Sequence, residues 1–469
     1  MAALPAMRLL RRPLAVALVF TALIFIGTFT RFHDQLLPSA VSSHHGHAST
    51  TSKFYSTEQD GSTYYSAQTP PFFPPVQGKT FRKADLCADF PVQLLNSVQI
   101  VLKTGAGEPA KTKAHLATVG SCISNLLIFS DNEERVGGHR IIDILADLPD
   151  SYKSSPDFAI YSSQKQAYAQ GEGVGYSAEG WKLDRFKFLP MVERAYQMRP
   201  KANWYVFIEA DVYYFWDTLF RLLSQLDPSK MHFMGSPTPG PEGTVFAYGG
   251  AGFVLSAGLM ASLNEGPVPL STQFENNAQT GCCGDSVLSY AILNKTGVGL
   301  QALYPTFAGD ELIGLKIDRE RWCIPLLGLH RVSPEQMSSL WEWERKRPYD
   351  KGPFTHSTIA DYIFPGILDT PVRTSWDNYA DIVQPEDSPA HASVAVCGLS
   401  CESDSFCLQY QYSEGVCKFG NFVQLGRQKD GVAITSGWNV KQMALLGYKK
   451  SPKKSSSCKK PTWLRPVVH

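Results

Sequence analysis

The chain has 469 residues, 43% of them hydrophobic and 12% aromatic, which is long enough for two or three folded units. Lysine and arginine number 44 against 43 aspartates and glutamates, so no charge bias points to nucleic acid or acidic partners. Ten cysteines are too few for a disulfide scaffold over the whole length, although four lie close together near the C-terminus. The composition predicts a globular protein.

The N-terminal segment has the pattern of a membrane anchor. Residues 1–12 carry three arginines and no acid, and residues 13–30 contain no charge. That apolar run is just long enough to cross a bilayer as a helix. We expect an uncleaved single span after a cytoplasmic tail, because positive charge stays on the cytosolic side. A cleaved signal peptide is the alternative, since small residues follow at Pro38-Ser-Ala40.

A polar stem is expected to separate this anchor from the folded body. Residues 31–85 are rich in serine, threonine, histidine and proline and have few aliphatic side chains, so they cannot bury a core. The first folded unit is expected over residues 86–380. Its first half offers candidate strands at 115–119, 125–129 and 158–161 and helical spacing over 140–148. Strands alternating with helices predict an α/β fold with a mostly parallel sheet and helices on both faces.

The segment 203–216 is the strongest signal in the chain. It begins as a continuous apolar run, typical of a strand buried on both faces. Glu209 and Asp211 then follow, and residues two apart in an extended chain point the same way. Open α/β sheets bind ligands at the carboxyl ends of their strands. Two carboxylates there suit Mg²⁺ or Mn²⁺ holding a diphosphate, although an isolated pair could equally be solvated.

Three other charged residues are candidates for binding a nucleotide donor. Asp131 follows the strand candidate at 125–129 and could contact a base or ribose, or simply form a turn. Asp184 and Lys187 lie near the start of a helix expected to run to about Met198. Lys187 could reach a phosphate, although an exposed helix face gives the same pattern.

Glycine-rich turns follow a predicted helix over 216–226 and a predicted strand over 233–235. Tyr248-Gly249-Gly250 opens a run in which the backbone could lie against a sugar or acceptor, or turn sharply. Asp285 stands at the start of a helix expected over 285–293, as a general base or as an N-cap.

The last candidates of this unit lie downstream. His330 ends an apolar run and could complete a mixed nitrogen and oxygen site suited to Mn²⁺, although a lone histidine is more often structural. Trp341, in a helix expected over 334–344, could stack on an acceptor sugar or pack in the core. Asn294-Lys-Thr296 is a glycosylation sequon.

A second, small unit is expected over residues 390–445. It contains four closely spaced cysteines, Cys397, Cys401, Cys407 and Cys417. A lumenal location favours disulfides over zinc ligation. The tail, 446–469, is basic and rich in serine, which predicts disorder.

Six segments, in this order, resemble the fringe-like glycosyltransferases of family 31, which include the core 1 β-1,3-galactosyltransferases. The resemblance covers residues 114–344, and its segments are LLIFSDNEE, GWKLDRFKFLP, WYVFIEADVYYFW, YGGAGFVLS, GCCGDSVLSYAI and HRVSPEQMSSLW. The E-A-D motif is similar to that of the fungal group of this family. The cysteine-rich segment resembles a short PAN/apple-like module, which implies binding of carbohydrate or protein.

The resemblance implies a Rossmann-like GT-A fold, a UDP-sugar donor, Mn²⁺ (or Mg²⁺) and inversion at the anomeric carbon. It implies a single-pass type II protein of the Golgi membrane with a lumenal catalytic domain. A hexose, galactose or N-acetylhexosamine, would pass to a glycan or glycoprotein, and the resemblance implies a β-1,3 linkage. By motif position Asp211 and His330 would bind the metal, Glu209 matches the first acid, and Asp285 matches the base. Ala210 departs from the family's D-D-D, so a non-catalytic lumenal glycan-binding protein is the alternative.

Overall fold

The computed structural model describes residues 55–56, 71–76, 86–172, 175, 177–347, 352–448, 458 and 460–469. The chain divides into two units, Met1–Lys53 and Phe54–His469, and the described residues all belong to the second. The predicted tail, anchor and most of the stem lie outside the described residues. Within the described ranges, no helix is long and apolar enough to cross a membrane.

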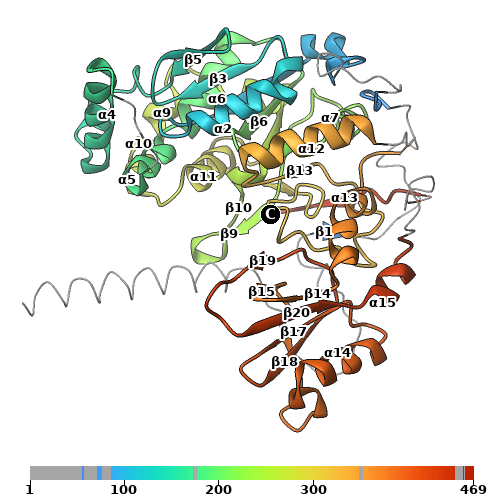
Figure 1. Ribbon diagram of the computed structural model, residues 1–469. Coiled ribbons are helices and arrows are strands. Elements are labelled where there is room, and N and C mark those ends of the chain that lie inside the picture. The colour runs from blue at the N-terminus through green and yellow to red at the C-terminus, as the bar shows by residue number, and fades with distance from the viewer. Residues whose placement is uncertain are drawn as a thin grey trace, which may run out of the picture. The chain divides into compact units, whose positions relative to one another are not determined.

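A ten-stranded sheet forms the core of the described unit (Figure 1). Strands β6, β2, β3 and β5 are mutually parallel neighbours, and β8 and β12 form a second parallel pair. Only β11, β21 and β4 run against the other seven strands, which confirms a mixed α/β fold with a mostly parallel sheet. In order across the sheet the strands are β1 (Tyr55–Ser56), β21 (Arg465–Val468), β12 (Gln301–Ala302), β8 (Phe233–Gly235), β11 (Phe253–Ser256), β6 (Trp204–Glu209), β2 (Val98–Lys103), β3 (Leu127–Ser130), β5 (His139–Asp143) and β4 (Glu134–Val136).

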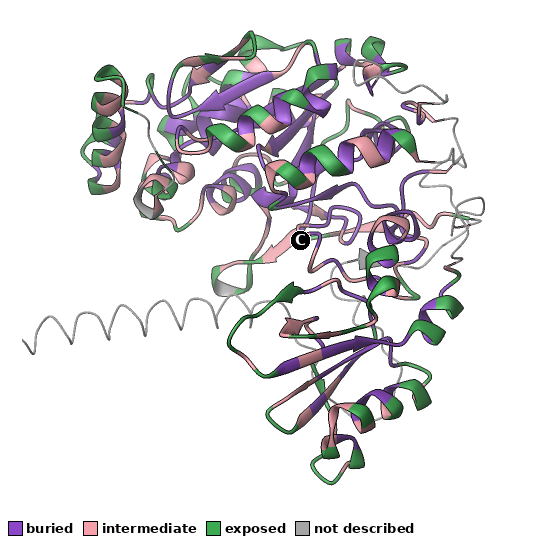
Figure 2. Cartoon of the chain, in the orientation of Figure 1, coloured by how far each residue is buried: buried purple, intermediate pink, exposed green. Residues whose placement is uncertain are grey.

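Helices cover both faces of this sheet. Along β6, Trp204, Val206 and Ile208 belong to one hydrophobic cluster, whereas Tyr205 and Phe207 belong to a second, because successive side chains point to opposite faces. Strand β2 is therefore buried throughout, and β6 is buried up to Ile208, with Glu209 partly exposed at its end (Figure 2). The first cluster includes residues of α2 (Pro109–Ala117), α7 (Trp216–Leu223), α12 (Pro334–Lys346) and α13 (His356–Asp369); the second includes residues of α6 (Phe188–Met198), α8 (Ala257–Leu263) and α11 (Gly284–Thr296).

Local sequence signals explain where several helices begin and end. Helix α12 starts with a capping box, in which Ser333 and Gln336 satisfy each other's backbone N–H groups, and has Pro334 at its first position. Helix α11 ends at Gly297, whose φ of 72° lies in the left-handed region that glycine adopts without strain. The predictions for 216–226, 233–235, 285–293 and 334–344 are confirmed as α7, β8, α11 and α12.

Three predictions in the first half of this unit are wrong. Residues 115–119 belong to the end of α2 and the turn after it, and residues 158–161 enter helix α4 (Ala159–Ala169). Residues 140–148 include β5, which pairs in parallel with β3, instead of a helix. Short apolar runs fit either element, and sheet pairing decides between them.

The cysteine-rich segment forms its own antiparallel sheet with a helix, α14 (Val394–Ser403). Disulfides join Cys397 to Cys417 and Cys401 to Cys407, which confirms disulfide pairing of these four cysteines. The sheet already includes strands that precede residue 390. In order its strands are β14 (Val372–Thr374), β20 (Ile434–Trp438), β17 (Gln409–Ser413), β18 (Val416–Gly420) and β16 (Ile382–Val383).

Residues 460–469 correct the prediction of a disordered tail for their part of it, whereas 449–457 and 459 lie outside the described residues. Strand β21 inserts between β1 and β12 in the main sheet, and Leu464 is buried against Ile324. A disulfide joins Cys458 to Cys323. The C-terminal residues therefore complete the main sheet, far along the chain from the strands they pair with.

Candidate functional site

The carboxyl end of β6 positions the two predicted acids. Glu209 is the last residue of the strand and stands in register with Lys103, the last residue of β2. A small antiparallel ribbon then pairs β7 (Tyr213–Tyr214) with β13 (Gly328–Leu329). The Val332 N–H donates to the Asp211 carbonyl at 3.0 Å. This ribbon carries His330, which follows β13, to Asp211 across more than a hundred residues of chain.

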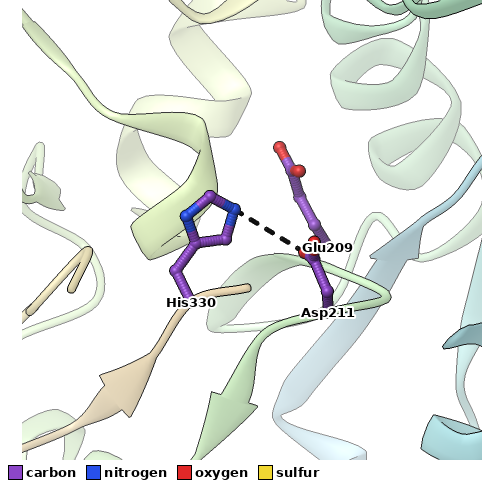
Figure 3. A group of neighbouring side chains, drawn as sticks. All are labelled: Glu209, Asp211 and His330. Carbon is purple, nitrogen blue, oxygen red and sulfur yellow. Dashed lines mark ion pairs between the residues drawn. The ribbon is translucent and has the colours of Figure 1, made fainter. Parts of the chain in front are cut away.

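Glu209, Asp211 and His330 form one cluster (Figure 3). One ligand atom from each lies within 4.8 Å of the others, and His330 Nε2 is 3.7 Å from Asp211 Oδ1. His330 Nδ1 lies 3.0 Å from the Tyr248 hydroxyl. With its proton on Nδ1, the ring donates to Tyr248 and keeps the Nε2 lone pair toward the carboxylates. Burial lowers the pKa of His330 to about 4, so the ring is neutral at pH 7.

This donor set fits a divalent cation of the Mn²⁺ type. Two carboxylate oxygens and one neutral imidazole nitrogen are ligands that Mn²⁺ accepts. Glu209 and Asp211 are separated by a single residue at the end of β6. Asp211 and His330 are each only 8% exposed. The sequence predicted all three residues as ligands, and the fold brings His330 beside the two acids.

The cluster also contains two lysines, Lys103 and Lys111, which were not among the residues predicted for the site. Lys103 Nζ lies 3.0 Å from Glu209 Oε1 and also pairs with Asp184. Lys111 Nζ lies 2.9 Å from Asp211 Oδ2 and 2.6 Å from Glu108 Oε1. Lys103 could have been suspected, since it ends an apolar strand next to the strand that carries Glu209. Lys111 lies on α2, and nothing in the sequence pattern distinguishes it from its neighbours.

The two acids differ in their affinity for protons. Burial raises the pKa of Glu209 to about 7, with Lys103 opposing and the charges of Asp184 and Asp211 adding to the rise. Burial also acts to raise the pKa of Asp211, but His330 and Lys111 outweigh it, so the pKa of Asp211 is lowered. Asp211 is thus the ionised member of the pair at neutral pH.

Asp285 is held against the glycine-rich turn. It lies in the first turn of α11, whose N-cap position belongs to Cys283, so Asp285 is not the N-cap. Its Oδ2 accepts the Gly249 N–H at 2.9 Å and its Oδ1 accepts the Ser286 N–H at 2.9 Å. Burial raises the pKa of Asp285, although these two hydrogen bonds oppose the rise. The carboxylate is a stronger base than an exposed aspartate.

The turn 248–250 connects this carboxylate to the metal-type cluster. Tyr248 contacts His330, Gly249 donates to Asp285, and Gly250 lies directly against the His330 ring. A Cβ on Gly250 would come within 2.4 Å of His330 Cε1. The structure therefore brings the predicted base, the predicted acceptor turn and the predicted metal ligands together.

Asp131 and Lys187 form a buried ion pair. Their charged atoms are 3.2 Å apart, and each side chain is 3% exposed. Lys187 also donates to the Thr104 carbonyl, and Asp131 accepts the Ala106 N–H at 2.6 Å. The pair thus fixes the loop that follows β2. Their donor-binding roles stay predictions, as does that of Asp184, which pairs with Lys103.

Of the two roles predicted for Trp341, the structure supports packing in the core and not stacking on an acceptor sugar. It is 2% exposed and packs in the core, with its ring 5.9 Å from that of Phe73. A tryptophan enclosed in this way has no ring face free for a sugar. Asn294, by contrast, is exposed on α11, so its glycosylation stays a prediction.

Comparison with known proteins adds no relative to this geometry. No protein-family model matches the chain, and no curated protein matches it. Six ordered sequence motifs, and the site that the fold assembles from four of them, are therefore the features that bear on function.

Proposed function

We propose that this chain is an inverting glycosyltransferase that moves a hexose from a UDP-sugar to a hydroxyl of a glycan or glycoprotein. The observation that carries the proposal is the placing of Asp285 and the Glu209–Asp211–His330 cluster on either side of one turn, residues 248–250. A transferase needs a general base and a cation site side by side, because the acceptor must attack while the diphosphate leaves.

Asp211, His330 and Glu209 would hold the divalent cation. When bound, the cation supplies positive charge that stabilises the leaving diphosphate. Lys103 pairs with Glu209 and Asp184 and would hold both acids in place for the donor. Asp131 and Lys187 would shape the donor site by fixing the loop 104–107 after β2.

Asp285 would act as the general base. Its carboxylate takes the proton of the acceptor hydroxyl as that oxygen attacks the anomeric carbon. The bond from the anomeric carbon to the diphosphate oxygen breaks in the same displacement, and UDP leaves with the bonding electrons. The raised pKa of Asp285 favours this role, since proton transfer to a more basic carboxylate is easier. Tyr248, Gly249 and Gly250 would line the acceptor side.

The proposal extends to fold type and location. A sheet with β11 antiparallel to β6, with acids at the carboxyl end of β6, is compatible with a GT-A arrangement. The apolar run at 13–30 would anchor the protein in the Golgi membrane with the disulfide-bonded units in the lumen. The small cysteine-rich sheet would bind carbohydrate or protein.

One observation favours a second function, a non-catalytic glycan-binding protein on the same fold. Lys111 already pairs with Asp211, the principal candidate ligand. Ala210, 2% exposed, supplies no carboxylate in the middle of the acidic motif. A binding protein would retain the acceptor turn and need no cation.

Hydrolysis of UDP-sugars separates the two functions. The full chain, with a panel of UDP-sugars, should release UDP with Mn²⁺ and not with a chelator. Asp211→Asn should remove this release, whereas Asp387→Asn, at an exposed loop position, should not. If no UDP-sugar is hydrolysed and no UDP is bound in the presence of Mn²⁺, the enzyme proposal fails.

A further inference from the structure

Lys111 has a contact that the proposed transfer reaction leaves unexplained. It lies in the first turn of α2, after the loop at the carboxyl end of β2. Its Nζ contacts Asp211 Oδ2 at 2.9 Å and Glu108 Oε1 at 2.6 Å. The other oxygen of Asp211 faces His330 Nε2 at 3.7 Å. An ammonium group therefore contacts the same carboxylate that is the principal candidate ligand for a cation.

The two lysines of the site differ in how tightly they are held. The Lys103 side chain is 6% exposed and pairs with two acids, so leaving would strand it in the interior. The Lys111 side chain is 35% exposed, and its flexible stem can reorient through solvent. Ion pairs of partly exposed lysines are weak and easily exchanged. Lys111 is thus the cation of this site that can move.

The charge around Lys111 explains why a cation is needed there. Lys103, Lys111 and Lys187 face six carboxylates in this partly buried site, so the acids outnumber the lysines two to one; the acids are Glu108, Asp131, Asp184, Glu209, Asp211 and Asp285. A divalent cation at Asp211 would supply the same compensation as Lys111. A cation bound to the Asp211 oxygen that faces His330 would be repelled by Lys111 on the other oxygen, so the two positive charges compete for one carboxylate.

We propose that Lys111 is a resident competitor of the divalent cation, and that it leaves Asp211 for the nucleotide diphosphate when both ligands bind. The inference rests on the proposed function, since it takes the cation and a nucleoside diphosphate as the ligands. Without nucleotide, Lys111 pairs with Asp211 and Glu108 among the described residues, and the cation must displace it. With a diphosphate present, Lys111 gains another anion and Asp211 becomes free. Cation and nucleotide therefore bind cooperatively, each strengthening the other by the same factor.

Direct measurement of Mn²⁺ binding tests this inference without any transfer reaction. Free Mn²⁺ is followed by electron paramagnetic resonance in the full chain in detergent, with and without UDP. Lys111→Gln should tighten Mn²⁺ binding without UDP by about tenfold, and the strengthening caused by UDP should shrink by a similar factor. The matched control is Lys113→Gln, which removes the same charge from an exposed position of α2 nearer Glu134, and it should change neither value.

The outcomes separate this inference from the proposed function. If Lys111→Gln binds Mn²⁺ no tighter than the unaltered chain while UDP still promotes binding, the competition is refuted and the transferase proposal stands. If neither protein binds Mn²⁺, both proposals fail. If only Lys111→Gln binds it, the competition is supported and metal-dependent transfer by the natural chain is not. Melting temperatures of Lys111→Gln and Lys113→Gln equal to that of the unaltered chain show that the fold is intact in both variants.

Discussion

Replacing Gly250 by alanine tests whether the glycine-rich turn fixes the position of His330. The new Cβ would lie 2.4 Å from His330 Cε1 and 2.7 Å from Nε2, whereas ordinary contact begins at 3.4 Å. The ring would have to retreat by 3.4 − 2.4 = 1.0 Å. Nothing in the backbone of Gly250 forbids alanine, since its φ is not positive. The expected damage is therefore displacement of one ligand, not strain of the turn.

The size of the effect follows from how strictly a ligand must be placed. Loss of a group that orients a metal-binding histidine costs about 10- to 100-fold in metal affinity. That corresponds to about 1.4–2.7 kcal/mol. We expect Gly250→Ala to weaken Mn²⁺ binding in the presence of UDP by this factor, measured by electron paramagnetic resonance.

A matched variant separates this effect from general destabilisation. Gly366→Ala, in α13, places a methyl group in open space and should leave Mn²⁺ binding unchanged. Both variants should give the circular dichroism spectrum of the unaltered protein. If Gly250→Ala binds Mn²⁺ within about twofold of the unaltered chain, His330 is not a ligand held by this turn.

Three further changes test other parts of the structure. Asp285→Asn should lower transfer by about 10²- to 10⁴-fold, because an amide cannot accept the proton; UDP binding by calorimetry should persist, and near-normal transfer would refute the role. Changing Cys397 and Cys417 together to serine removes a link between residues 20 apart and should cost about 3 kcal/mol in urea unfolding. A loss below about 1 kcal/mol would contradict that reasoning. Burial lowers the pKa of His356 from 6.5 to about 3, so the stability present above pH 6.5 falls as the pH drops toward 3. Between pH 7 and 5 this histidine should cost about 2 kcal/mol, and a His356→Gln variant with undiminished pH dependence would exclude it as the cause.

Local sequence patterns predicted an element correctly where its own residues were enough to distinguish strand from helix. The apolar run before Glu209 predicted a buried strand, and its register with Lys103 places both residues at the same edge of the sheet. Helices were predicted at 285–293 and 334–344, and both exist as α11 and α12, although the N-cap of α11 is Cys283 and not Asp285. The run at 140–148 was misread because its apolar spacing fits a helix, and only pairing with β3 makes its first part a strand.

The sequence by itself predicted two acids facing the same way at a strand end, with a glycine-rich turn and a third acid downstream, and it favoured disulfides for the four clustered cysteines. Tertiary structure decided which of these meet. The ribbon of β7 and β13 brings His330 to Asp211, and the turn 248–250 joins that pair to Asp285. It also decided that Trp341 is enclosed and that Lys111 lies on Asp211. Contacts between residues a hundred positions apart depend on how the sheet is assembled, and no local spacing records that.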